Sequence, residues 1–287
     1  MRPAILIAII LILLTLGAAG AHLQATTTDL SRFNPGWSGT AAFYSLASSM
    51  DAQILAPGTP EPDFADRYII IAPKDASPSL VAEQVLKSGG TVIIADEEGD
   101  ANQLLQALGS RMRIVPGNVS SIDMEFASTR TIIARVSGNH TLLEGISTLA
   151  FNRPSHITGG TPLVRTSVLS WVDTTGTGRP GAGASLGRYT LIANEDLDPG
   201  EIILIADASL FATTMQQVRR LHDNGQLLRN MLDYNGTVSV DAVYGKTADA
   251  DGPAYIIHKV KSAPISTIVA ILLLMAFVIV AYRKQIL

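Results

Sequence analysis

The chain has 287 residues, with 25 Asp and Glu against 21 Lys and Arg, and it contains no cysteine. The lack of cysteine excludes disulfides, thiolate metal sites and a cysteine nucleophile. The mild acidic excess, with no basic cluster longer than the pair Arg219 and Arg220, argues against nucleic acid as a partner.

The chain begins with a hydrophobic segment. Between Arg2 and Asp29 there is no charged residue. This pattern predicts an N-terminal transmembrane anchor over residues 1–28, or a signal peptide that is cleaved near the small residues 18–21. We favour an uncleaved anchor, because the apolar run is long for a signal peptide.

Residues 29–261 are expected to form a single α/β domain. A turn-rich entry precedes a short helix at 40–49, and a strand follows near Ile54. The apolar run 68–72, the helical segment 79–87 and the apolar run 91–95 then read as a βαβ unit. Continuous apolar strands are typical of a parallel sheet that is buried on both faces.

The middle of the domain changes character. A helix is predicted at 101–108, followed by β-rich sequence with strand candidates at 131–136 and 164–172, which we interpret as an insertion or antiparallel extension. The α/β pattern then returns with a strand at 201–206, a long helix at 213–232 and a last strand at 238–243. We expect three of the apolar runs to be adjacent parallel strands: 69–72, 92–95 and 202–205.

The chain ends with a second hydrophobic segment. Residues 262–282 carry no charge and would extend over roughly 30 Å as a helix, which predicts a transmembrane helix and a short cytoplasmic tail within 262–287. Arg2 before the first segment, and Arg283 with Lys284 after the second, predict that both termini are cytoplasmic. The expected location is therefore the cell membrane, with the lipid bilayer as a partner and the domain outside.

Three Asn-x-Ser/Thr sequences would accept glycans if the domain lies outside the cytoplasm. They begin at Asn118, Asn139 and Asn235, each in a context typical of turns. The sequence thus allows a glycoprotein.

The most specific motifs lie between residues 166 and 226. They include Gly-Glu-Ile-Ile-Leu-Ile-Ala-Asp-Ala-Ser-Leu-Phe at 200–211 and Asp-Asn-Gly at 223–225. Together with Asn-Pro-Gly at 34–36 and Lys-Ser-Gly-Gly-Thr-Val at 87–92, this order resembles membrane-anchored members of the class I glutamine-amidotransferase-like (GATase-like) superfamily. The resemblance covers about 31–235.

The resemblance implies a flavodoxin-like parallel sheet and a catalytically inactive branch of the superfamily. The composition agrees on the second point, because a class I amidotransferase attacks its amide with a cysteine thiolate that is paired with a histidine. No cysteine is present to do so.

Serine is the remaining candidate nucleophile. Ser209 follows an apolar strand, but its neighbours lack the glycines of a nucleophile elbow. The five histidines are scattered and none suggests a partner. Asp207 and Ser209 are explained as well by capping the helix that follows, since Asp and Ser at a helix start accept backbone N–H bonds.

Two acidic segments are candidate metal or ligand sites. The sequence Asp-Thr-Thr-Gly-Thr-Gly at 173–178 has the outline of a calcium loop, but Ala184 stands where the twelfth-position Glu would be needed, so a glycine-rich loop is the better interpretation. Asp96, Glu97 and Glu98 follow a strand end, where open α/β sheets bind ligands. A solvated loop is the better interpretation of these three residues. No metal or cofactor is predicted.

The sequence therefore predicts a membrane-tethered, non-catalytic binding or scaffold module, one form of which is an auxiliary subunit of a membrane complex such as an ABC-type transport system. A protein partner in that complex is expected. The ligand or partner surface should gather at the strand ends, at Asn34, Asp96, Asp207 and Ser209. The alternative function is a serine-dependent hydrolase that uses Ser209.

Overall fold

The computed structural model describes residues 13–14, 16–17, 27–57, 65–123, 126, 128–181, 184–217 and 222–248. The chain divides into two units, one comprising 1–25 with 251–287 and the other comprising 26–250. In the first unit the described residues are Leu13, Leu14, Leu16 and Gly17, which are helical.

The predicted membrane spans are corrected by the structure. Among the described residues we find no helix with the length and hydrophobicity that a membrane span requires. The segments that carried the prediction, 1–28 and 262–287, lie almost wholly outside the described residues. The predicted location in the cell membrane, with two spans and both termini cytoplasmic, depended on these segments and is corrected with the spans.

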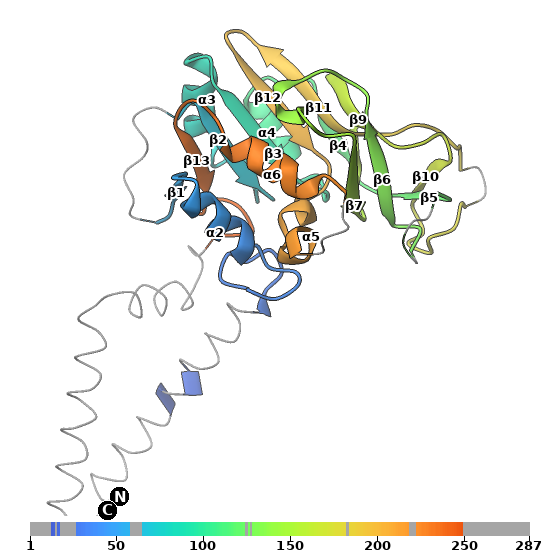
Figure 1. Ribbon diagram of the computed structural model, residues 1–287, viewed down its shortest axis with the longest axis horizontal. Helices are drawn as coiled ribbons and strands as arrows, with labels where there is room; N and C mark the ends of the chain where they lie inside the picture. Colours follow the sequence, from blue (N-terminus) through green and yellow to red (C-terminus); the bar gives the residue numbers. More distant parts are fainter. Residues whose placement is uncertain are drawn as a thin grey trace, which may run out of the picture. The chain divides into compact units, whose positions relative to one another are not determined.

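The second unit is built on one large sheet (Figure 1). It has 11 strands in the order β1-β13-β2-β3-β12-β11-β9-β6-β7, with β8 paired to β11 and β4 paired to β8. A separate two-stranded sheet pairs β10 with β5. The strands are β1 Gln53–Leu55, β2 Arg67–Ile71, β3 Thr91–Ala95, β4 Arg113–Val115, β5 Asn118–Ser121, β6 Thr131–Val136, β7 Thr148–Asn152, β8 His156–Thr158, β9 Thr161–Arg165, β10 Ser170–Asp173, β11 Thr190–Leu197, β12 Gly200–Ile205 and β13 Val238–Asp241.

The helices are short. They are α2 Ala41–Ser49, α3 Ser79–Lys87, α4 Ala101–Ala107, η1 Thr141–Leu143, η2 Ala208–Phe211, α5 Thr213–Gln217 and α6 Asn224–Leu232.

The prediction of a flavodoxin-like parallel sheet is wrong. Strands β1, β13, β2, β3 and β12 are parallel to one another, but β12-β11, β11-β9, β9-β6, β6-β7, β11-β8 and β8-β4 are all antiparallel pairs. The sheet is therefore mixed and mostly antiparallel. The physical reason is that the β-rich middle of the chain adds its strands to the sheet itself, beyond β12, through hairpin-type pairing that needs no crossover helix.

The narrower prediction about three apolar strands is confirmed. Strand β3 lies between β2 and β12 and is parallel to both, with Ile93 opposite Ile69 on one side and Ile203 on the other. All five residues of β2 and of β3 are buried. This burial explains why both strands are apolar without alternation.

Helices cover both faces of this parallel part. The odd-numbered residues Ile69, Ile93 and Ile203 belong to a core with α2 and α6. The even-numbered residues Ile70 and Ile94 belong to a second core with α3 and α4. Successive side chains of a strand point to opposite faces, so one apolar run supplies both cores.

The predicted long helix at 213–232 is two helices. Helix α5 ends at Gln217 and α6 begins at Asn224, with His222 in a left-handed conformation (φ 48°) just before it. Residues 218–221 are not described. The chain turns here because Asp223 and Asn224 bind the edge of β7, as described below, and a continuous helix would carry them away from it.

Candidate functional site

The carboxyl ends of β3 and β12 lie side by side. Ala95 is opposite Ile205 at the last position of the parallel pairing, and the Asp96 N–H donates to the Ile205 carbonyl. The residues that follow each strand, Glu97 and Asp207, are therefore brought together at one edge of the sheet. This is where open α/β sheets bind ligands.

An open cleft of about 990 Å³ lies at this edge, and we call it the strand-end cleft. Its walls come from the loop before α2, the loop after β3, the β5–β10 sheet, the end of β7 and the segment after β12. It is lined by Asp29, Leu30, Trp37, Ser38, Glu97, Glu98, Pro116, Gly117, Asn118, Asn152, Arg153, Ser155, Asp173, Thr174, Thr175, Gly176, Ser209, Ala212, Thr214, Met215 and Lys246.

Only one of the four predicted binding residues lines the strand-end cleft. Ser209 does, whereas Asn34, Asp96 and Asp207 are buried beneath or beside it. The other three residues hold the walls of the cleft in place, and the binding role of all four stays a prediction.

Asp96 organises the loop that follows β3. Its carboxylate accepts the backbone N–H groups of Glu98, Gly99 and Ala101, at 2.9 to 3.0 Å. These donors include the first residue of α4, whose N–H has no partner within the helix. Asp96 therefore fixes the loop that carries Glu97 and Glu98 into the cleft.

Asn34 organises the loop before α2. Its Oδ1 accepts the Gly36 N–H at 2.8 Å, and its Nδ2 donates to the Thr28 carbonyl at 2.9 Å. A Cβ at Gly39 would lie 1.9 Å from the Asn34 carbonyl oxygen, so only glycine fits there. This compact loop presents Trp37 at the rim of the cleft.

Asp207 caps η2 and also pairs with the main chain of β7. Its Oδ1 accepts the Ser209 N–H at 2.9 Å and the Ser209 hydroxyl at 2.6 Å, and its Oδ2 accepts the Asn152 N–H at 2.7 Å. The expected cap is present at Asp207, whereas Ser209 lies inside η2.

Asp207 is one of three side chains that complete the edge of β7. The Asp223 carboxylate accepts the Thr148 N–H at 3.1 Å, and the Asn224 amide both accepts from and donates to the Ala150 main chain at 2.8 Å. The N–H groups of residues 148, 150 and 152 are thereby all bonded to side chains. The Asp-x-Ser and Asp-Asn motifs thus have a structural role, which is to close a sheet edge.

Glu97 lines the cleft, although only Asp96 of the acidic group 96–98 is among the four predicted binding residues. Its Oε2 accepts the Ala208 N–H at 2.8 Å, and burial raises its pKa. Burial also raises the pKa of Asp207 to about 7, with a further contribution from the Glu97 carboxylate. Two interacting carboxyl groups with raised pKa values therefore lie at this edge of the sheet, Glu97 in the cleft wall and Asp207 buried.

Two cations line the cleft, and they differ in whether an acidic side chain pairs with them. Lys246 pairs with Glu98 at 2.5 Å and with Asp100 at 3.4 Å. Arg153 is exposed, has a positive φ of 57°, and its guanidinium makes no ion pair or hydrogen bond with any residue that the structure describes. Arg153 is thus the cation that remains available to a ligand.

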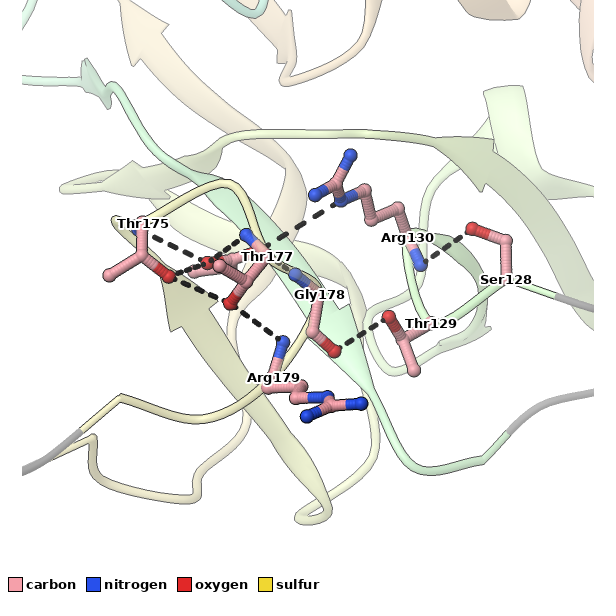
Figure 2. A network of polar contacts seen from close by, with 8 residues as sticks. Ser128, Thr129, Arg130, Thr175, Thr177, Gly178 and Arg179 are labelled. Carbon is pink, nitrogen blue, oxygen red and sulfur yellow. Dashed lines mark hydrogen bonds and ion pairs between the residues drawn. The ribbon is translucent and has the colours of Figure 1, made fainter.

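The glycine-rich loop at 173–178 forms one wall. Asp173 accepts the N–H groups of Thr175, Thr177 and Gly178 and the Thr175 hydroxyl, and it lies 3.8 Å from Arg130. Thr129 donates to the Gly178 carbonyl at 2.9 Å, which ties the loop to the turn that precedes β6 (Figure 2). The carboxylate is thus saturated by its own loop, and the described residues contain no cluster of three or more His, Asp or Glu that could hold a metal.

No imidazole lines the strand-end cleft among the described residues. His140 contacts Glu201 at 3.1 Å, His222 contacts Thr148 at 2.7 Å, and His156 makes an edge-to-face contact with Tyr189. His22 and His258 lie outside the described residues. Ser209 has Asp207 as its side-chain partner and no base of the usual kind within the described part of the chain.

The three predicted glycosylation sites have different surroundings. Asn118 begins β5 and is half-buried, whereas Asn139 and Asn235 are exposed outside helices and strands. No finding supports the prediction that the protein is a glycoprotein, so that prediction is corrected.

Comparison with protein-family models gives a match that covers most of the chain. The profile of the family named Domain of unknown function (DUF4350) matches residues 32–232. No curated protein matches the chain. The matched range contains most of the strand-end cleft, including Trp37, Glu97, Arg153 and Ser209.

Proposed function

We infer that this chain, which belongs to the family named Domain of unknown function (DUF4350), is a non-catalytic binding module whose ligand occupies the strand-end cleft. The observation that carries this proposal is the cleft itself. An open volume of about 990 Å³ meets the carboxyl ends of two parallel strands, and its walls are fixed by Asn34, Asp96 and Asp173. Large preformed concave sites with convergent polar groups are the usual ligand sites of proteins.

The lining supports binding better than hydrolysis. Ser209 donates its hydroxyl proton to Asp207 at 2.6 Å, and its backbone is part of η2 instead of a strand-to-helix elbow. Asp207 in turn is held by the Asn152 N–H. A base that must also cap a helix and close a strand edge is poorly placed to accept and return a proton. The resemblance to inactive members of the GATase-like superfamily stays a prediction that agrees with this proposal.

The test uses the full-length chain and one variant of the cleft. Ligands from three classes, polar metabolites, short peptides and oligosaccharides, are screened by thermal shift against the wild type and Arg153→Gln. Binding to the folded state raises the melting temperature, so a true ligand shifts the wild type more than the variant. Arg179→Gln is the matched control, because Arg179 is exposed and does not line the cleft. Equal shifts in all three proteins would contradict a ligand site at this place.

A serine-reactive fluorophosphonate probe examines the non-catalytic part of the proposal. We expect no labelling of the native protein. Specific labelling at Ser209 that disappears on denaturation would show an activated serine and would contradict the proposal. Ser209→Ala should cost about 1 kcal/mol of stability, the usual worth of one hydrogen bond.

A further inference from the structure

We propose that the ligand of the strand-end cleft is a neutral carbohydrate, with the indole of Trp37 as the surface on which a sugar ring stacks. This inference rests on the proposed function and adds the chemical class of the ligand. Three features support it: the exposure of Trp37, the polar groups that line the cleft and the charge balance of its walls.

Trp37 is exposed and yet held by a fixed loop. Its side chain is 77% exposed and lines the cleft. The Thr214 N–H donates to the Trp37 carbonyl at 3.2 Å, and the N–H and hydroxyl of Thr213 both donate to the Gly39 carbonyl. A single exposed apolar residue is ordinary on a protein surface, but here hydrogen bonds hold the backbone that carries a large planar ring at the rim of a polar cleft. Such a ring offers apolar area at a low cost in side-chain entropy.

The groups beyond Trp37 match sugar hydroxyls. The side-chain amides of Asn118 and Asn152 line the cleft and make no hydrogen bond with any described residue. Glu97 uses one carboxylate oxygen for the Ala208 N–H, which leaves Oε1 as an acceptor. Amides can donate to and accept from hydroxyl groups, and a carboxylate accepts from them, while a sugar ring presents hydroxyls at its rim and C–H groups on its face.

The charge balance argues against an anionic ligand. Lys246 is neutralised by Glu98 and Asp100, and Asp173 by its own loop and Arg130. Of the other charged residues that line the cleft, Arg153 is a cation, and Asp29 and Glu97 are acids. An anionic ligand such as a phosphate would meet more carboxyl groups than cations, whereas an uncharged sugar can donate its hydroxyl protons to them.

An extended peptide is a less suitable occupant. Peptides commonly bind by adding a strand to an exposed sheet edge. The edge that runs into the cleft is that of β7, and its N–H groups at residues 148, 150 and 152 already bind Asp223, Asn224 and Asp207.

The chain reports on Trp37 directly, because it has two tryptophans and Trp171 is only 1% exposed. Quenching of tryptophan fluorescence by acrylamide therefore measures the accessibility of Trp37. Four neutral oligosaccharides of different linkage serve as probes: cellohexaose, chitohexaose, xylohexaose and mannohexaose. We expect at least one to protect Trp37 in the full-length protein.

Calorimetry with the protective oligosaccharide then tests the variants. Trp37→Ala should weaken binding by about tenfold or more, the upper range for one aromatic contact, whereas Trp37→Phe should retain most of it. Asn152→Ala should weaken binding several-fold. Leu80→Ala is the matched control, because Leu80 is 72% exposed on α3 and does not line the cleft. Circular dichroism verifies that each variant is folded.

Two results would overturn the inference: no protection of Trp37 by any of the four oligosaccharides, or equal affinity in Trp37→Ala and the wild type. If a peptide or metabolite from the thermal-shift panel binds in an Arg153-dependent way instead, the carbohydrate inference fails and the binding function stands. If no class binds, both fail.

Discussion

Asp207 is subject to two opposing effects on its ionisation. Burial raises its pKa to about 7, helped by the charge of Glu97, while the hydrogen bonds from Ser209 and Asn152 favour the carboxylate. Glu97 has a raised pKa for the same leading reason, burial. The two carboxyl groups are therefore coupled, and a change at one alters proton binding at the other.

The first prediction follows from this coupling. An acid whose pKa is higher in the folded than in the unfolded protein gains a proton on folding between the two values, so the free energy of unfolding falls as pH rises through that window. For Asp207 the window runs from 3.8 to about 7. Glu97→Gln keeps an acceptor for the Ala208 N–H but removes the neighbouring charge, so the fall should be shallower in the variant.

Urea unfolding at a series of pH values measures how the free energy of unfolding changes with pH in the wild type and in Glu97→Gln. Each unit by which the folded-state pKa exceeds the unfolded-state pKa corresponds to about 1.4 kcal/mol. Carbon-detected NMR titration of the Asp207 carboxyl separates its contribution from the loss of Glu97 itself. An unchanged Asp207 pKa in Glu97→Gln would contradict the coupling.

The second prediction concerns Gly39. A Cβ there would overlap the Asn34 carbonyl oxygen, so Gly39→Ala should destabilise the protein by about 1–3 kcal/mol through displacement of the loop that carries Trp37. Gly181→Ala is the control, since a Cβ at Gly181 meets no atom within 4 Å. Thermal unfolding of the two variants should differ clearly, and equal melting temperatures would show that the loop relaxes freely.

At the level of elements, the edge of β7 explains several sequence features together. A strand at a sheet edge exposes unpaired N–H groups that can join another chain. Here α6 begins with Asp223 and Asn224 facing that edge, and η2 begins with Asp207 facing it. The first residues of two helices therefore supply the acceptors for the unpaired N–H groups of one strand.

The third prediction tests this arrangement. Asp223→Ala and Asn224→Ala each leave a β7 N–H group without its acceptor, which should destabilise the protein by about 1–3 kcal/mol. Because the freed edge can pair between molecules, light scattering on mild heating should also rise. Asp233→Ala, on the exposed end of α6, should change neither property. Loss of stability in the control of the same size would argue that α6 itself, and not the β7 edge, is the cause.

In unit 26–250, helices cover both faces of the parallel half of the large sheet, whereas β5 and β10 form a small separate sheet. Strands β2, β3 and β12 have helices on both faces and paired strands on both sides. The β5–β10 sheet has two strands, and exposed apolar residues lie at its end, among them Ile122, Val168 and Leu169. Figure 1 shows these two strands beyond β6, at the opposite end from β1.

The fourth prediction is that the two regions open separately. Amide hydrogen exchange should be slowest in β2, β3 and β12, near the limit set by global unfolding, and clearly faster in β5 and β10. Because the β5–β10 sheet forms a wall of the strand-end cleft, a bound ligand should slow exchange there more than in the parallel strands. Uniform protection across both regions would show a single cooperative unit.

Local pattern was enough to predict the central elements. The runs 69–72, 92–95 and 202–205 are apolar without alternation, and such runs are buried on both faces whatever the rest of the fold. Their parallel order followed from the helical segment between the first two. Helices α2, α3 and α4 were also predicted within about one residue, because each has a periodic apolar face and a clear stop.

The tertiary structure decided the pairing of the β-rich middle and the roles of the polar residues. Whether a strand joins its sheet in a parallel or antiparallel sense depends on partners distant in sequence, which is why the flavodoxin-like prediction failed beyond β12. Asp207, Asp223 and Asn224 look like binding or capping residues in the sequence, and only the position of β7 shows that they close a sheet edge. Trp37, Glu97 and Arg153 come from separate segments, so they could be recognised as neighbours only once the fold had brought them to one cleft.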